Sequence, residues 1–150
     1  QLGIAQSMAN LEYLEESNHE TPLLPHCEPA RTQVRSFCNL IACDIHPLNN
    51  LRVQQYLKNA LGADEKAGQE WYVHWVHEGF AALEELTSDG SHVLGDTPTL
   101  ADALLVPQIY NARRFNVPLS AFPKLVRVAD ACSELPAFKK AAPELQPDAA

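Results

Sequence analysis

Two adjacent arginines, Arg113 and Arg114, end an otherwise apolar stretch with the sequence PQIYNARRF, residues 107–115. A guanidinium holds a carboxylate through two parallel hydrogen bonds and stays charged when it is partly desolvated. Neighbouring positions on a helix lie about 100° apart, so the two side chains cannot easily share one partner. The alternative for each is a solvent-facing cation near a helix C-terminus, which the helix dipole favours. We favour that alternative for Arg113.

Cations are scarce in this chain. It has 150 residues and carries 11 Lys+Arg against 19 Asp+Glu, a formal net charge of −8. Nucleic acids and anionic membranes need a basic surface, so we expect neither as a partner. No apolar run approaches the roughly 18 residues of a membrane span. A small anionic ligand remains compatible with this composition if a few cations gather in one cleft.

A second group of polar residues surrounds Pro47 in the stretch HPLNNLR, residues 46–52. Proline removes an amide donor and clashes with the carbonyl of Cys43, so the sequence predicts a kinked helix. The residue before a proline is driven toward an extended conformation, which would turn His46 out of the apolar stripe. The alternative is a solvated kink whose residues cap the resumed helix, and we favour it for Asn49.

Gln6 and Ser7 open the first helical pattern. The free amides and the positive dipole end of a helix N-terminus suit a carboxylate. The simpler interpretation is that Ser7 only caps the helix, and the sequence alone favours it.

These residues must be positioned by helices, because no convincing period-two strand occurs in the sequence. The apolar spacing predicts an all-α chain with a bend at Pro107 and a capping box formed by Thr99 and Asp102. The expected helices are residues 7–16, a stripe from Pro29 to Ile45 that resumes as far as Gly62, 64–86, a segment following Thr99, and 123–133.

The cysteines and histidines do not form a metal motif in the sequence, and we expect no metal. The four cysteines have no CxxC spacing and are typical of thiols in a reducing compartment. We expect Cys38 and Cys43 to fill the core. His74 and His77 lack a nearby third ligand, which favours packing or surface roles. We expect Trp71 and Trp75 to pack in the protein interior. We expect Glu84 and Glu85 to face solvent.

Several motifs together resemble one class of the glutathione transferase superfamily. QSMANLEYLEE is similar to its glutathione-binding turn and the following helix, and GDTPTLAD to the capping box of its helical domain. DIHPLNNLRV, WVHEGFAALE, TLADALLVPQIYNARRF and APELQPDA resemble the zeta class, the maleylacetoacetate and maleylpyruvate isomerases. The resemblance implies a C-terminal-type helical bundle at residues 29–150, a linker at 19–28, and at 1–18 the last helix of a thioredoxin-like domain that is otherwise missing.

The resemblance also implies the site. Glutathione is the expected cofactor, and the residues that thiol activation requires would lie upstream, so we expect no catalytic residue in this chain and no activity from it alone. The substrate would be bound by Arg114, with Arg52 as a second candidate. The glutathione-binding positions would be Gln6, Ser7, His46, Asn50 and Arg52.

The implied activity is glutathione-dependent cis-trans isomerisation of maleylpyruvate or maleylacetoacetate in aromatic catabolism. The cofactor thiolate would add to the cis double bond, and rotation and elimination would release the trans isomer. We expect a cytoplasmic enzyme that is a homodimer when full length, with a small dicarboxylate substrate. The alternatives are a transferase that conjugates small electrophiles and a non-catalytic helical interaction module. An interaction module would need none of the four residues Gln6, Ser7, Arg52 and Arg114.

Overall fold

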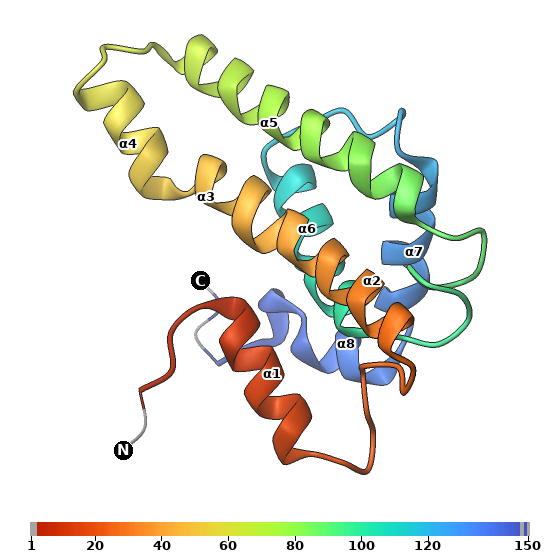
Figure 1. The fold of residues 1–150 in the computed structure, drawn as a ribbon. Coiled ribbons are helices and arrows are strands. Elements are labelled where there is room, and N and C mark those ends of the chain that lie inside the picture. Colours follow the sequence, from red (N-terminus) through yellow and green to blue (C-terminus); the bar gives the residue numbers. More distant parts are fainter. Residues whose placement is uncertain (1–2, 148, 150) are drawn as a thin grey trace.

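The computed structural model describes residues 3–147 and 149, and within them the regular structure is helical, as predicted (Figure 1). A single isolated bridge joins His92 to Gly95 in a loop. The elements in chain order are α1 (Ser7–Ser17), α2 (Glu28–Asn39), the π-helix η1 (Leu40–Ile45), α3 (His46–Asn49), α4 (Leu51–Asn59), α5 (Glu65–Leu86), α6 (Leu100–Arg114), α7 (Pro123–Ser133), α8 (Pro136–Ala141) and the 3₁₀ turn η2 (Pro143–Leu145).

The chain does not kink at Pro47 as expected; it widens into a π-helical turn. The His46 amide donates to the Ile41 carbonyl, five residues earlier. This wider turn accommodates the proline ring where an α-helical turn would place it against the Cys43 carbonyl. His46 therefore stays helical, with φ −58° and ψ −44°, and the prediction that it is extended was wrong. The chain turns instead at Asn50, where ψ is 146°.

The buried residues of α2 and η1 follow one helical stripe. Cys38 lies before the turn and is fully buried, as predicted. Cys43 lies within it and is exposed, so the expectation that it fills the core was wrong. At about 100° per residue, Cys43 lies opposite the buried stripe of Val34, Phe37, Cys38, Ile41 and Ile45, so regular helical spacing accounts for its exposure.

Helix α6 packs against α2, η1 and α7, and helix α5 packs against η1, α3, α4 and α7. Helix α5 begins after Asp64, whose side chain accepts the Ala67 amide at 2.8 Å. The predicted capping box of Thr99 and Asp102 forms at the start of α6, and α6 runs through Pro107 without a break. The large core side chains come from these helices, η1, α2 and α7 and include Phe37, Ile41, Ile45, Phe80, Leu83, Leu105, Ile109 and Leu125.

Gly79 is the point where α5 approaches η1 most closely, since a Cβ atom there would run into Cγ1 and Cδ1 of the buried Ile45. We expect Gly79→Ala to lower the free energy of unfolding by about 1–3 kcal/mol, because a well-packed core resists an added methyl group. Gly68 in the same helix has open space around it, so Gly68→Ala should raise stability by roughly 0.5–1 kcal/mol. Chemical denaturation of the two variants tests this contrast, and an equal effect would contradict the close approach.

Helix α1 packs along one side of the bundle. Arg35 of α2 makes a two-pronged contact with Glu12, from Nε to Oε1 at 2.7 Å and from NH2 to Oε2 at 3.0 Å. Met8 and Leu11 pack against the core, whereas Tyr13 and Leu14 are half exposed. Side-chain contacts thus fix α1 to the bundle.

Glu84 has a structural role that its sequence context did not predict. Its two carboxylate oxygens accept the amides of Lys124 and Leu125, at 2.9 and 3.0 Å. It therefore caps the start of α7, and the prediction of a solvated face was wrong for this residue. Among the described residues no helix is both long and apolar enough to cross a membrane.

Candidate functional site

The start of α1 carries unusual backbone geometry. Gln6 has φ 76° and ψ 131°, a region that L side chains rarely adopt, and it is the N-cap residue. Ser7 is the first helical residue and makes no capping hydrogen bond, so the prediction that it is the N-cap was wrong. The first amides of the helix consequently have no side-chain partner within the described residues. Backbone strain of this kind is commonly retained where a binding turn needs it.

The junction of η1, α3 and α4 holds several buried polar atoms. His46 Nε2 and both side-chain polar atoms of Asn49 are buried and have no hydrogen-bond partner in the described structure. Asn49 is therefore not the solvated residue that we expected. Burial lowers the pKa of His46, and Gln108 opposes this shift through its side-chain amide. No spacing in the sequence indicated Asn49 or Gln108, because only the packing of α6 against η1 brings Gln108 to His46.

Two hydrogen bonds fix the position of this junction. The Trp71 indole Nε1 donates to the Leu48 carbonyl at 2.8 Å and joins α5 to α3. Asn50 Oδ1 accepts the Arg52 amide at 3.1 Å and caps α4. The Arg52 side chain is exposed and has no ion-pair partner among the described residues. The capping function that we expected of this stretch thus belongs to Asn50.

The two adjacent arginines differ in their contacts. Arg113 NH2 lies 2.8 Å from Asp130 Oδ1 of α7, and both side chains are about half exposed. Arg114 has no carboxylate within ion-pair distance in the part of the chain that the structure describes, and its guanidinium carbon lies 5.8 Å from the centre of the Phe115 ring. Arg113 therefore links α6 to α7, and Arg114 carries a positive charge that no acidic side chain of the described residues neutralises.

The charge of Arg114 acts on two tyrosines. Burial raises the pKa of Tyr72, and Arg114 opposes that rise. A hydrogen bond to Glu144 raises the pKa of Tyr110, and Arg114 again acts in the opposite direction. Tyr72 also stacks on Phe115, with ring centroids 4.4 Å apart. Arg114 therefore lies beside an aromatic group formed by residues of α5 and α6.

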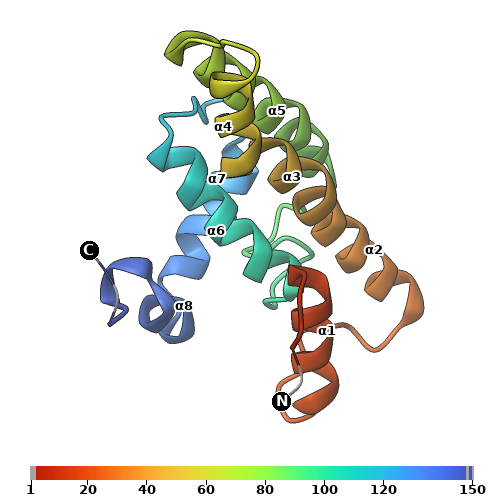
Figure 2. The same cartoon turned by 90° about the vertical axis from the view of Figure 1, so that its left-hand side faces the viewer.

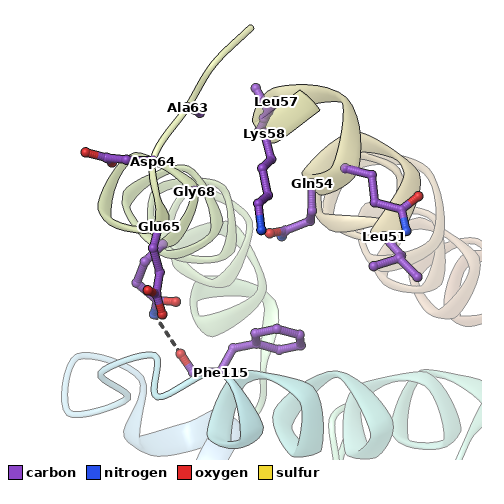
Figure 3. A pocket seen from close by; sticks show the side chains of 11 residues that line it. Leu51, Gln54, Leu57, Lys58, Ala63, Asp64, Glu65, Gly68 and Phe115 are labelled. Atoms are coloured by element: carbon purple, nitrogen blue, oxygen red, sulfur yellow. Dashed lines mark hydrogen bonds between the residues drawn. The ribbon is translucent and has the colours of Figure 1, made fainter. Parts of the chain in front are cut away.

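An open hollow of about 580 Å³ lies between α4, the start of α5 and Phe115 (Figure 3). Gln54 and Lys58 reach into it from α4, facing Phe115 on the opposite side. The Gln69 side chain donates to the Phe115 carbonyl at 2.7 Å and fixes that side. Two lining residues, Leu51 and Phe115, are the chain neighbours of Arg52 and Arg114. The side chains of the two arginines are not part of its lining.

The elements that carry the sequence-predicted residues lie on one side of the bundle. The N-terminal end of α1 is the end nearer α3 in both views (Figures 1 and 2). The structure thus gives these residues three separate positions: the start of α1, the junction from α3 to α4, and the end of α6. The assignment of Gln6, Ser7, His46, Asn50, Arg52 and Arg114 to a single site remains a prediction.

A further polar cluster lies in the core, where the fold brings together His92, Asp102 and Cys132. Cys132 Sγ is 3.4 Å from His92 Nδ1, which is 3.5 Å from Asp102 Oδ1. Burial raises the pKa of the Cys132 thiol to about 12, with Asp102 adding to the shift, so the sulfur is not the thiolate that metals bind. The Asp102 oxygens already accept the amides of Val93 and Thr99. Hydrogen bonding accounts for this cluster, which sequence spacing did not reveal.

The helical bundle, its capping box and the strained turn before α1 define a class of proteins. Residues 53–136 match the sequence model of the glutathione S-transferase C-terminal domain. The chain is 46% identical to a maleylpyruvate isomerase from a Ralstonia species, over 98% of this chain and 71% of that protein. The chain belongs to the glutathione S-transferase family, in its zeta class of maleylpyruvate and maleylacetoacetate isomerases.

Solved structures agree with this assignment. A holo structure of a bacterial zeta-class maleylpyruvate isomerase superposes with a TM-score of 0.94, at 46% identity and over 98% of this chain and 71% of the other. A maleylacetoacetate isomerase from Anaeromyxobacter dehalogenans, with glutathione in its active site, superposes with a TM-score of 0.91 at 41% identity. The match covers 98% of this chain and 68% of the other. A maleylacetoacetate isomerase from Methylobacterium extorquens, with bound malonate and glutathione, also superposes with a TM-score of 0.91, at 32% identity. The match covers 98% of this chain and 71% of the other.

Proposed function

We propose that this chain is part of a glutathione-dependent isomerase that converts a cis maleyl dicarboxylate, maleylpyruvate or maleylacetoacetate, into its trans isomer. The observation that carries the proposal is Arg114, a guanidinium without an acidic partner in the described structure of a chain with net charge −8. A carboxylate of the substrate would supply the acidic partner that Arg114 lacks among the described residues. Malonate, a dicarboxylate, is bound together with glutathione in one of the similar isomerases.

The residues present fit glutathione. The start of α1 offers unpaired amides and the Ser7 hydroxyl to the γ-glutamyl carboxylate, and Gln6 holds the turn in its strained conformation. Asn49 offers a donor and an acceptor, both buried and unpaired. Arg52 and the free side of Asn50 supply a cation and an amide from the start of α4. When bound, glutathione supplies the thiol nucleophile that makes rotation about the double bond possible.

The protein's own contribution is to position and neutralise the dicarboxylate. Arg114 would bind one carboxylate, and Arg52, an exposed cation at the start of α4, would receive a second negative group. We further propose that residues 1–18 belong to a glutathione-binding domain, that 19–28 form a linker, and that the whole protein is a cytoplasmic homodimer. These proposals rest on the resemblance to the zeta class.

The direct test is an isomerase assay of the full-length protein on both maleyl substrates, with and without glutathione. We expect turnover of at least one substrate that depends on added glutathione. Turnover of neither substrate, together with conjugation of uncharged electrophiles, would replace this proposal with a general transferase.

Replacing Arg52 tests the contribution of α4. We expect Arg52→Ala to lower kcat/KM about ten- to a hundredfold, mainly through KM, because a charge-assisted hydrogen bond is worth about 1.5–3 kcal/mol. Its thermal stability should barely change, since the Arg52 side chain is exposed and unpaired in the described structure. Lys66→Ala removes an equally exposed cation of α5 as the control. Kinetics that match this control would leave Arg52 as a solvent-facing residue.

A further inference from the structure

A buried glutamine faces the histidine of the α3 junction. Gln108 lies on α6, is only 1% exposed, and its Oε1 atom has no hydrogen-bond partner in the described structure. His46 Nε2, on the adjoining element, is also buried and unpaired. Helix α6 packs against η1, which leads directly into His46, and the Gln108 side chain acts on the pKa of the imidazole ring, so the two side chains are neighbours.

The two unpaired atoms are complementary if His46 Nε2 carries a hydrogen. An amide oxygen can only accept, and a buried donor or acceptor without a partner costs about 1–3 kcal/mol. A small side-chain movement that closes the contact satisfies both atoms at once. We propose that Gln108 is a positioning residue: its Oε1 accepts a hydrogen bond from His46 Nε2 and thereby fixes the tautomer of His46, leaving Nδ1 as an acceptor.

This tautomer determines which ligand group His46 can meet. Nδ1 is not among the buried unpaired atoms and makes no hydrogen bond within the described residues, so it is open to a ligand. Burial keeps the ring neutral at pH 7, and no charged side chain of the described residues contributes to its pKa. His46 should therefore receive an N–H group, such as a peptide amide or an ammonium group, and not a carboxylate. This ligand assignment rests on the proposed function, whereas the tautomer does not.

The opposite arrangement has a distinct signature. If the Gln108 amide were turned over, its NH₂ group would donate to His46 Nε2, and the ring hydrogen would lie on Nδ1. The two tautomers differ in the ¹⁵N chemical shifts of the ring nitrogens. The measurement needs no ligand and no substitution at Gln108, so it remains decisive even if a substitution there impairs folding.

The experiment is NMR of full-length protein labelled with ¹⁵N histidine. The chain has six histidines, and the signals of His46 are assigned by their loss in His46→Gln. We expect a neutral ring at pH 7 with the hydrogen on Nε2. Gln108→Leu should give a mixture of tautomers, and Gln108→Glu should raise the pKa of His46. Gln33→Leu, at an exposed position of α2, should change neither. A ring with its hydrogen on Nδ1, or a tautomer indifferent to Gln108→Leu, would overturn the proposal.

Titration with glutathione separates this proposal from the proposed function. We expect glutathione to shift the Nδ1 signal of His46 and to bind Gln108→Leu about two- to tenfold more weakly, as expected for one neutral hydrogen bond. If the tautomer is as proposed but glutathione neither binds nor supports isomerisation, the function fails and the role of Gln108 stands. If glutathione binds and the tautomer is the opposite one, the proposed role of Gln108 fails and the function stands.

Discussion

Arg114→Ala is expected to lower kcat/KM for a maleyl dicarboxylate about ten- to a hundredfold in the full-length protein, because it removes a charge-assisted, two-pronged contact. The neighbouring Arg113→Ala is the matched control. Arg113 already pairs with Asp130 on the protein surface, so its loss should cost at most about 1 kcal/mol of stability and little activity. Steady-state kinetics and thermal unfolding of both variants make the comparison.

Further measurements show whether Arg114 grips a carboxylate or only makes the cleft positive. Arg114→Lys should restore activity only in part, since an ammonium group cannot reproduce the two parallel hydrogen bonds. Activity toward an uncharged electrophile should survive Arg114→Ala better, and added salt should weaken the dicarboxylate reaction modestly. Equal losses from the two alanine variants would indicate a general electrostatic effect and exclude a specific clamp.

Asp102→Ala is expected to cause the largest loss of stability. Asp102 is fully buried, and its side chain accepts the amides of Val93 and Thr99 at 2.9 and 2.8 Å and the Thr99 hydroxyl at 3.0 Å. Each amide left buried and unpaired costs about 1–3 kcal/mol, so the free energy of unfolding should fall by roughly 2–6 kcal/mol. Urea unfolding monitored by circular dichroism measures the difference.

Asp96 provides the control within the same loop region. It is exposed, and its Oδ1 accepts only the Ser91 amide, at 3.3 Å, so Asp96→Ala should cost less than about 1 kcal/mol. Asp102→Asn keeps an acceptor oxygen and should fall between the two alanine variants. A loss for Asp102→Ala as small as that for Asp96→Ala would mean that water replaces the capping box at little cost.

The sequence predicted those parts of the fold that local rules determine. The long helix at residues 64–86, the capping box at Thr99 and the helix at 123–133 follow from residue types at helical spacing, and the structure confirms each. The start of α1 was misplaced by one residue, because a serine before an apolar pattern is the usual N-cap. The strained Gln6 takes that position instead.

The errors have separate physical causes. The π-helical turn keeps the residue before Pro47 helical, so the local rule that predicted an extended His46 did not hold. The exposure of Cys43 agrees with regular helical spacing, and the expectation that this residue fills the core came from its residue type alone. The roles of Glu84, Asn49 and Gln108 depend on contacts between elements far apart in the sequence. Arg114 was identified through its family resemblance, whereas its lack of an acidic partner within the described residues became apparent only from the structure.

The hydrogen bond from Trp71 to α3 makes the tryptophan fluorescence of this chain sensitive to the position of α3. Trp71 and Trp75 are the only tryptophans in the sequence, and their rings lie edge to face with centroids 5.7 Å apart. The tryptophan fluorescence of the chain therefore originates at one place, where the Trp71 indole reaches the Leu48 carbonyl. A movement of α3 that weakens this bond changes the polarity around Trp71, one of the two emitters. The intensity and wavelength of emission thus report on the His46 junction without an added dye, whereas loops remote from α5 remain invisible to this signal.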